Sequence, residues 1–215
     1  MAIGSPQWMY SSGEYELDQS LRFNDDDSAV LSKDFSTSET SDKIKTLSLW
    51  IKRSNLGQMD LWGCNAASED ANTRTICYFD SNDKLNLQSR LSGSGDSLAT
   101  LMQFRDTSAW YHLVFSFDTT QSTASERFKF YVNGVLTSTL LYSETISQNR
   151  VIQFGNNISS SSSRIGDTNS SGFAKFDGYI SEVNFIDGQQ LTPADFGETG
   201  TYGEWKPKEY SGTYG

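Results

Sequence analysis

Apolar residues in this chain come in short runs that alternate with polar residues. In residues 44–53, Leu47, Leu49 and Ile51 fall on one face and Trp50 falls on the other, together with its polar neighbours. A period of two is the mark of a β-strand. Runs of the same kind occupy residues 58–65, 74–80, 84–89, 110–118, 128–132, 135–140, 152–154, 163–165 and 179–187. Clusters of Gly, Asn, Asp and Ser separate these runs, so the pattern predicts an all-β fold.

Particular residues sharpen this prediction. Residues 110–118 are apolar on both faces, which predicts a central strand. Asn133-Gly134 lies between two strand-like runs and predicts a two-residue hairpin with positive φ at both positions. Thr192 and Pro193 predict a very short helix over residues 191–196, with Thr192 as its N-cap. The serine-rich stretches 92–97 and 156–171 are expected to be polar loops. Many strands without intervening helices predict antiparallel sheets packed as a sandwich.

Composition narrows the classes of partner. The net charge of −10 and pI near 4.5 argue against nucleic acid, because phosphate binding needs clustered Lys and Arg. No apolar run is long enough for membrane insertion. The N-terminus has no basic region followed by an apolar one, so no signal peptide is expected. An aromatic content of 13% allows relatively few rings to fill a core.

The two cysteines lie in neighbouring strand-like runs. If residues 58–65 pair with 74–80 around a loop centred near residue 70 or 71, Cys64 faces Cys77 and Trp62 faces Phe79. Two interpretations stay open, a pair of buried thiols and a cross-strand disulfide.

Several stretches together resemble a known superfamily. They are residues 20–28 (SLRFNDDDS), 47–52 (LSLWIK), 110–115 (WYHLVF), 130–134 (FYVNG), 176–183 (FDGYISEV) and 187–193 (DGQQLTP). In this order they resemble the laminin-G-like, concanavalin A-like lectin superfamily. The resemblance implies an antiparallel jelly-roll β-sandwich over residues 18–197, with an N-terminal extension (1–17) and a C-terminal tail (198–215). The same fold serves lectins and glycoside hydrolases, so the choice between binding and catalysis depends on the residues considered below.

A narrower resemblance concerns residues 19–25 (QSLRFND), 104–112 (FRDTSAWYH), 195–198 (DFGE) and 205–208 (WKPK). These stretches are similar to tail-fibre-like and other particle-surface proteins in the virions of marine bacteriophages. The likeness implies a virion protein assembled in the host cytoplasm. Its partner would be a host or environmental glycan, or other virion proteins, including further copies of this chain as a homo-oligomer.

Candidate ligand residues follow from these hypotheses. A sugar site needs an exposed aromatic ring for stacking, and Trp110, Tyr78 and Trp205 are the candidates, although each ring could equally belong to the core. The resemblance further implies calcium as a cofactor in oxygen-rich loops. Its candidate ligands are Asp25, Asp27, Asp118 and Asp167. The alternative for these aspartates is ordinary turn chemistry, in which they cap the local backbone.

Catalysis has little support in the sequence. A glycoside hydrolase of this fold needs two carboxylates on one strand face, but Ile180 and Asn184 stand two residues either side of Glu182. His112 is the single histidine, and no Gly-x-Ser-x-Gly elbow accompanies it. We therefore expect no enzyme. Three hypotheses remain: glycan binding, a structural virion part joined through tail aromatics (Tyr202, Trp205, Tyr210 and Tyr214), and glycoside hydrolysis.

Overall fold

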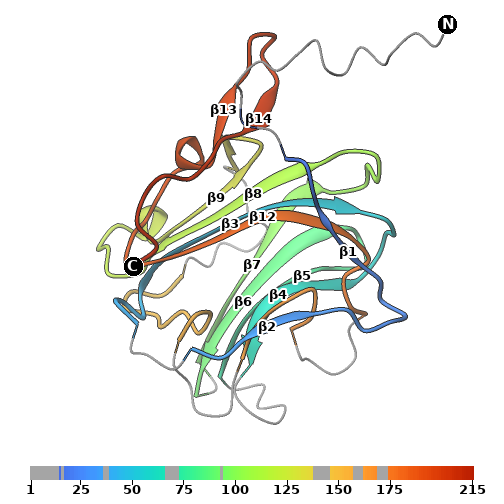
Figure 1. Cartoon of the computed structure of the whole chain (residues 1–215). Coiled ribbons are helices and arrows are strands. Elements are labelled where there is room, and N and C mark those ends of the chain that lie inside the picture. The colour runs from blue at the N-terminus through green and yellow to red at the C-terminus, as the bar shows by residue number, and fades with distance from the viewer. Residues whose placement is uncertain are drawn as a thin grey trace, which may run out of the picture.

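In the computed structural model the chain forms two six-stranded antiparallel sheets packed face to face (Figure 1). The structure describes residues 15, 17–35, 39–65, 73–92, 94–137, 146–156, 162–168 and 174–215. Helical structure among these residues is limited to two 3-10 turns, η2 (Ala124–Glu126) and η3 (Pro193–Asp195). None of the helices in this part of the chain is long and apolar enough to cross a membrane. The predicted all-β jelly-roll sandwich is confirmed.

The first sheet holds six strands in the spatial order β1-β12-β3-β8-β9-β10. Their bounds are β1 (Leu21–Phe23), β12 (Gly178–Asp187), β3 (Ile44–Arg53), β8 (Tyr111–Asp118), β9 (Phe128–Val132) and β10 (Val135–Leu136). β8 lies between β3 and β9 and is buried on both faces, so the predicted central strand is confirmed.

The second sheet has the order β2-β11-β4-β5-β6-β7. Its strands are β2 (Leu31–Lys33), β11 (Ser163–Ile165), β4 (Met59–Asn65), β5 (Arg74–Phe79), β6 (Lys84–Leu91) and β7 (Ser94–Gln103). A separate two-stranded hairpin, β13 (Gly197–Thr199) with β14 (Trp205–Pro207), stands at one end of the sandwich (Figure 1).

The core fills the space between the two sheets. Leu47, Leu49 and Ile51 of β3 belong to it, as their alternation predicts. Trp62 of β4 packs edge-on against Phe115 of β8, with ring centroids 5.0 Å apart. Most of the buried aromatic and aliphatic side chains therefore belong to this one core, and the residues that alternate with them form the outer faces.

Two local predictions are confirmed by backbone geometry. Asn133 and Gly134 both have positive φ, 48° and 81°, as a two-residue hairpin between β9 and β10 requires. Thr192 caps η3 through a capping box with Asp195, and Pro193 occupies the first turn. The helix is a single 3-10 turn.

The predicted register of the cysteines is wrong. Asn65 pairs with Arg74, so the loop between β4 and β5 is centred one residue earlier than predicted, and this moves each partner by two positions. Cys64 faces Thr75, and Cys77 faces Trp62 instead. Both thiols are buried and they are not joined in a disulfide. Burial raises the pKa of Cys77 well above its usual value, which keeps this thiol unreactive.

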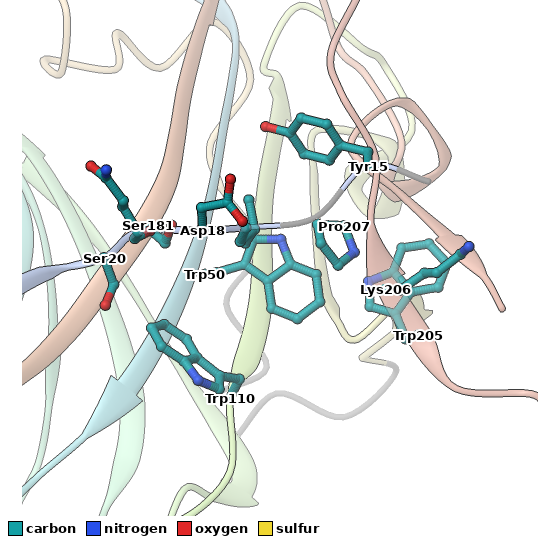
Figure 2. A pocket seen from close by; sticks show the side chains of 11 residues that line it. Tyr15, Asp18, Ser20, Trp50, Trp110, Ser181, Trp205, Lys206 and Pro207 are labelled. Atoms are coloured by element: carbon teal, nitrogen blue, oxygen red, sulfur yellow. Dashed lines mark hydrogen bonds between the residues drawn. The ribbon is translucent and has the colours of Figure 1, made fainter. Parts of the chain in front are cut away.

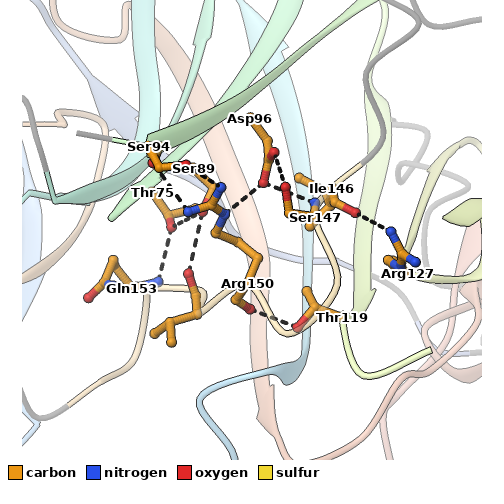
Figure 3. Close-up of polar contacts among 11 residues, drawn as sticks. Thr75, Ser89, Ser94, Asp96, Thr119, Arg127, Ile146, Ser147, Arg150 and Gln153 are labelled. Atoms are coloured by element: carbon orange, nitrogen blue, oxygen red, sulfur yellow. Dashed lines mark hydrogen bonds and ion pairs between the residues drawn. The ribbon is translucent and has the colours of Figure 1, made fainter. Parts of the chain in front are cut away.

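Two segment predictions are corrected as well. Most of residues 92–97 belongs to β7 rather than to a loop, because Ser92 adopts positive φ and turns the chain directly from β6 into β7. Residues 152–154 are buried but form no strand, because side chains make part of the hydrogen bonds of their backbone. The backbone N–H of Gln153, for example, donates to Thr75 Oγ1 (Figure 3).

Two further predictions are tested only in part. Residues 135–140 form a strand only as far as Leu136, and 138–140 lie outside the described residues. The predicted loop 156–171 contains the short strand β11, while 157–161 and 169–171 are likewise outside the described residues.

Candidate functional site

The segment that follows β12 covers much of the outer face of the first sheet. Ser116 of β8 donates its hydroxyl to the Leu191 carbonyl at 2.6 Å. Val114, Ile186 and Phe196 form a second, small apolar cluster under this segment. Within this segment, the β13–β14 hairpin places Trp205 beside the part of the sheet that carries Trp50 (Figures 1 and 2).

Trp205 packs against two glycines. A Cβ atom on Gly134 would lie 2.6 Å from the Trp205 ring, and one on Gly197 would lie 2.5 Å from it. Gly134 is also at positive φ, so the β9–β10 turn requires glycine for its backbone and for the indole above it. This close approach fixes the position of Trp205.

His112 of β8 lies between two indoles. Its ring is nearly parallel to Trp50 (centroids 4.8 Å, 18°) and to Trp205 (5.9 Å, 20°). Trp205 Nε1 donates to His112 Nδ1 at 2.9 Å, so the neutral ring carries its hydrogen on Nε2 and donates it to Ser48 Oγ at 2.8 Å. Complete burial lowers the pKa of His112 to about 4.

A cavity of about 470 Å³ opens beside these rings. It is lined by Tyr15, Leu17, Asp18, Gln19, Ser20, Trp50, Trp110, Ser181, Trp205, Lys206 and Pro207. Figure 2 shows Trp50 in the middle of the group, with Trp110 and Trp205 on either side of it. Trp50 is only 7% exposed, whereas Trp110 is 37% exposed. The pocket therefore combines one rigid buried indole with one that is open to solvent.

The N-terminal segment forms the remaining wall. Ser181 of β12 donates its hydroxyl to the Gln19 carbonyl at 2.7 Å. The Tyr15 hydroxyl donates to Glu182 Oε1 at 2.5 Å. Burial and this bond to a carboxylate raise the pKa of Tyr15 to about 12. Glu182 itself is at positive φ (49°), in the bulge that separates Ser181 from Asn184.

Charged groups at the pocket differ in how they are paired. Lys206 Nζ lies 3.3 Å from Glu198 Oε1 across the β13–β14 hairpin. Asp18 is exposed and forms no hydrogen bond or ion pair with any residue that the structure describes. In Figure 2 it lies next to Trp50. Among the described residues, the polar rim thus presents one carboxylate without a protein partner.

The structure brings together two of the three predicted sugar-binding aromatics. Trp110 and Trp205 line the same pocket, although they are far apart in the sequence. Tyr78 lies on the second sheet, on the opposite face of β5 from Cys77 and Phe79, where its hydroxyl accepts a hydrogen bond from Gln88. It is not part of the pocket.

Sequence reasoning missed Trp50, Asp18 and Gln19 as pocket residues. The alternation along β3 already placed Trp50 on the face opposite Leu49 and Ile51, which is the outer face of the sheet. A large ring at an outward position of a central strand is the signal that could have found it. Nothing in the sequence marks Asp18 or Gln19.

The four predicted calcium ligands are engaged locally. Asp118 accepts hydrogen bonds from Thr120 and Gln121 in the turn after β8. Asp167 forms ion pairs with Arg164 and Lys175. Asp25 accepts a hydrogen bond from the Asp26 backbone N–H, and Asp27 accepts one from the Asn24 side chain, within and next to the turn of residues 25–28. Among the described residues, no three acidic, His or Cys side chains gather into a group that could hold a metal ion.

The fold and pocket define a jelly-roll domain with a ligand-sized cavity on one outer face. The sequence profile of the concanavalin A-like lectin/glucanases superfamily (Laminin_G_3) matches residues 23–195, most of the chain. The chain belongs to this family. A search of curated proteins found no significant match.

Solved structures share the fold at low sequence identity. The NanB sialidase from Streptococcus pneumoniae is 17% identical with a TM-score of 0.55 over 84% of this chain and 28% of its own. Domain 4 of AbnA, a GH43 extracellular arabinanase from Geobacillus stearothermophilus in complex with arabinotriose, is 24% identical (TM-score 0.51, 75% of this chain and 66% of its own). The CBM40 of the Ruminococcus gnavus IT-sialidase is 16% identical (TM-score 0.51, 76% and 95%). These likenesses concern the fold alone.

Proposed function

We propose that this chain binds carbohydrate, without cleaving it, in the pocket of Trp50, Trp110 and Trp205. The observation that carries the proposal is the convergence of three indoles on one cavity of about 470 Å³ with a polar rim. Small-molecule sites are concave, mostly apolar, and carry a few placed polar groups. The rim here offers the Asp18 carboxylate, the Gln19 amide and the Ser20 hydroxyl for sugar hydroxyls.

The rings are held in place before any ligand arrives. Trp205 is held by Gly134 and Gly197 and by its hydrogen bond to His112, and Trp50 is stacked on His112. A binding surface that is already ordered loses less side-chain entropy when the ligand binds. Trp110 is the exposed ring on which the apolar face of a sugar would stack.

The family and its structural relatives agree with this proposal. The family name joins lectins and glucanases, and domain 4 of the arabinanase was solved with arabinotriose. Non-catalytic binding is supported by the lining, in which Asp18 is the sole carboxylate among the described residues. Glycosidases use two carboxyl groups about 5 to 9 Å apart across the scissile bond.

Replacing Trp110 with alanine tests the site. The wild-type protein is first screened on a glycan array, and the best sugar is then titrated by isothermal calorimetry. We expect Trp110→Ala to weaken binding about tenfold or more. Stacking of a nucleic-acid base on an aromatic ring contributes on the order of 1–3 kcal/mol, and the apolar face of a sugar would use Trp110 in the same way. Since Trp110 is 37% exposed, the variant should keep its fold, which circular dichroism checks.

The matched control is Tyr202→Ala, an aromatic that is 95% exposed and does not line the pocket. It should bind as the wild type does. Equal affinity of wild type and Trp110→Ala for the array ligand would place sugar binding elsewhere and contradict the proposal. Release of new reducing ends from the bound oligosaccharide would contradict the non-catalytic part.

The structural alternative receives less support from the tail aromatics. Trp205 lines the pocket, Tyr210 stacks on Phe196 at 5.1 Å, and Tyr214 packs on Tyr210. These rings serve contacts within the chain, and Tyr202 is the most exposed of the four. We therefore favour sugar binding over assembly through the tail.

We also propose that the domain works on the surface of a bacteriophage particle. The support is the sequence likeness of residues 19–25, 104–112, 195–198 and 205–208 to virion proteins. An antibody against the chain should label intact particles in electron micrographs. Its failure to label particles whose proteins include this chain by mass spectrometry would contradict surface exposure.

A further inference from the structure

Carboxylates lie in and next to the lining of the pocket. Asp18 lines it without a partner among the described residues, and Glu182 lies behind Tyr15 at its N-terminal wall. Lys206 is the cation of the lining, but Glu198 stands 3.3 Å from its ammonium group. Three carboxylates and one ammonium group therefore lie in or next to the lining, in a chain whose net charge is −10.

The aromatic rings of the pocket also favour a positively charged ligand. The face of an indole is the negative end of its quadrupole, and tryptophan attracts cations better than tyrosine or phenylalanine does. Trp50 lies next to Asp18 in Figure 2, and Trp110 lines the same pocket on the side of Trp50 away from Trp205. A cation held between the Asp18 carboxylate and these rings would meet favourable electrostatics from both sides.

We propose that the pocket selects a saccharide that carries a protonated amine, of the glucosamine type, over its N-acetylated form and over sugars that carry carboxylates. This inference rests on the proposed sugar-binding function and names its ligand class. The ammonium group would pair with Asp18, and the ring that bears it would stack on Trp110. A uronic or sialic carboxylate would instead approach Asp18 and be repelled.

The test compares three matched β-linked oligosaccharides by isothermal calorimetry: a glucosamine oligomer, its fully N-acetylated counterpart and a uronic acid oligomer. The titrations are run near pH 5, where exposed carboxylates are charged. The sugar amine, whose pKa the neighbouring oxygens hold below that of lysine, is protonated there. We expect the amine form to bind about tenfold more tightly than the N-acetylated form, from one exposed ion pair and one cation–π contact. The uronic oligomer should bind more weakly than either.

Two isosteric variants separate a specific contact from general attraction between an acidic protein and a cation. Asp18→Asn should remove most of the preference for the amine form. Asp26→Asn changes the net charge by the same amount. Asp26 lies in the exposed turn after β1, whereas the pocket lies at the start of β1, so this variant should keep the preference for the amine form. Trp110→Ala should weaken all binding.

Each other result has a defined meaning. Equal affinity for the amine and N-acetylated forms, or an equal loss in Asp18→Asn and Asp26→Asn, overturns the inference while sugar binding itself stands. Absence of binding to all three oligomers also overturns it. In that case the Trp110-dependent array measurement decides separately whether the proposed function fails.

Discussion

His112 is the residue on which the arrangement of the pocket depends. It is completely buried, yet both ring nitrogens are used, one by Trp205 and one by Ser48. A polar ring in such a place is stable only when its hydrogen bonds are made. The neutral imidazole satisfies both bonds, whereas the imidazolium would turn Nδ1 into a donor that faces the indole N–H.

Acid should therefore destabilise the folded chain through His112. The unfolded chain takes up the histidine proton near pH 6.5, whereas the folded chain resists it until about pH 4. The contribution of the neutral His112 ring to the free energy of unfolding is fully present above pH 6.5 and is lost as the pH falls towards 4. We expect this group to contribute ~3 kcal/mol to that loss in the free energy of unfolding. Urea unfolding across this pH range measures it.

His112→Phe provides the comparison, because His112 is the single histidine of the chain. Phenylalanine keeps a ring between Trp50 and Trp205 but cannot titrate. The variant should be less stable at pH 7, since Ser48 and Trp205 lose a buried partner. The difference between the two proteins should shrink as the pH falls from 6.5 to 4, and a constant difference would contradict the assignment.

Single residues of the pocket could be predicted only in part. Trp110 and Trp205 were candidates as aromatics near a strand start or in the tail, and the alternation along β3 gave the outward direction of Trp50. Tyr78 shows the same outward alternation but lies on the other sheet. The local pattern predicts on which face of its strand a side chain lies. It does not predict which outward-facing side chains come together in the folded chain.

At the scale of elements, residues 146–156 show how an irregular segment can imitate a strand. Ile152 and Phe154 are buried on either side of Gln153, which produces the period of two. The segment is anchored by side chains instead of a ladder (Figure 3). Arg150 Nε pairs with Asp96 Oδ2 at 2.7 Å, and Ser147 donates to the same carboxylate through its hydroxyl and its amide. Long-range polar bonds of this kind leave no local sequence signal, whereas the Asn133-Gly134 hairpin does.

Removing Asp96 should release this segment. Burial alone would raise the pKa of Asp96, but hydrogen bonds from Arg150 and Ser147 lower it, so the carboxylate is charged in the folded chain. Asp96→Ala leaves a buried guanidinium without its partner and should lower the free energy of unfolding by ~3–5 kcal/mol. Denaturant unfolding monitored by tryptophan fluorescence measures the change.

An exposed pair serves as the control. Glu126 and Lys129 are 2.6 Å apart, but the Glu126 side chain is 48% exposed. Glu126→Ala should cost below ~1 kcal/mol, as surface pairs usually do. Similar losses in the two variants would mean that the Asp96–Arg150 pair does not anchor residues 146–156.

The whole molecule explains why the fold could be predicted more fully than the site. Strand positions depend on alternation within about ten residues, and most of the predicted strands are confirmed. The pocket joins Tyr15, residues 17–20, Trp50, Trp110 and residues 205–207. These meet only after the sheet has formed and the segment after β12 has covered it. The residues expected as a tail, 198–215, contribute a strand and a wall of the site.

This arrangement couples the stability of the cover to ligand binding. Phe196 is buried in the small cluster with Val114 and Ile186, next to Gly197 on which Trp205 packs, but it does not line the pocket.

Phe196→Ala should lower the free energy of unfolding by ~3–5 kcal/mol. It should also weaken sugar binding, measured by calorimetry at a temperature where the variant is still folded, because the β13–β14 hairpin loses its support. Trp110→Ala should instead lose binding while its thermal stability stays near normal. Full affinity in a destabilised Phe196→Ala protein would mean that His112, Gly134 and Gly197 hold Trp205 in place without help from the cover.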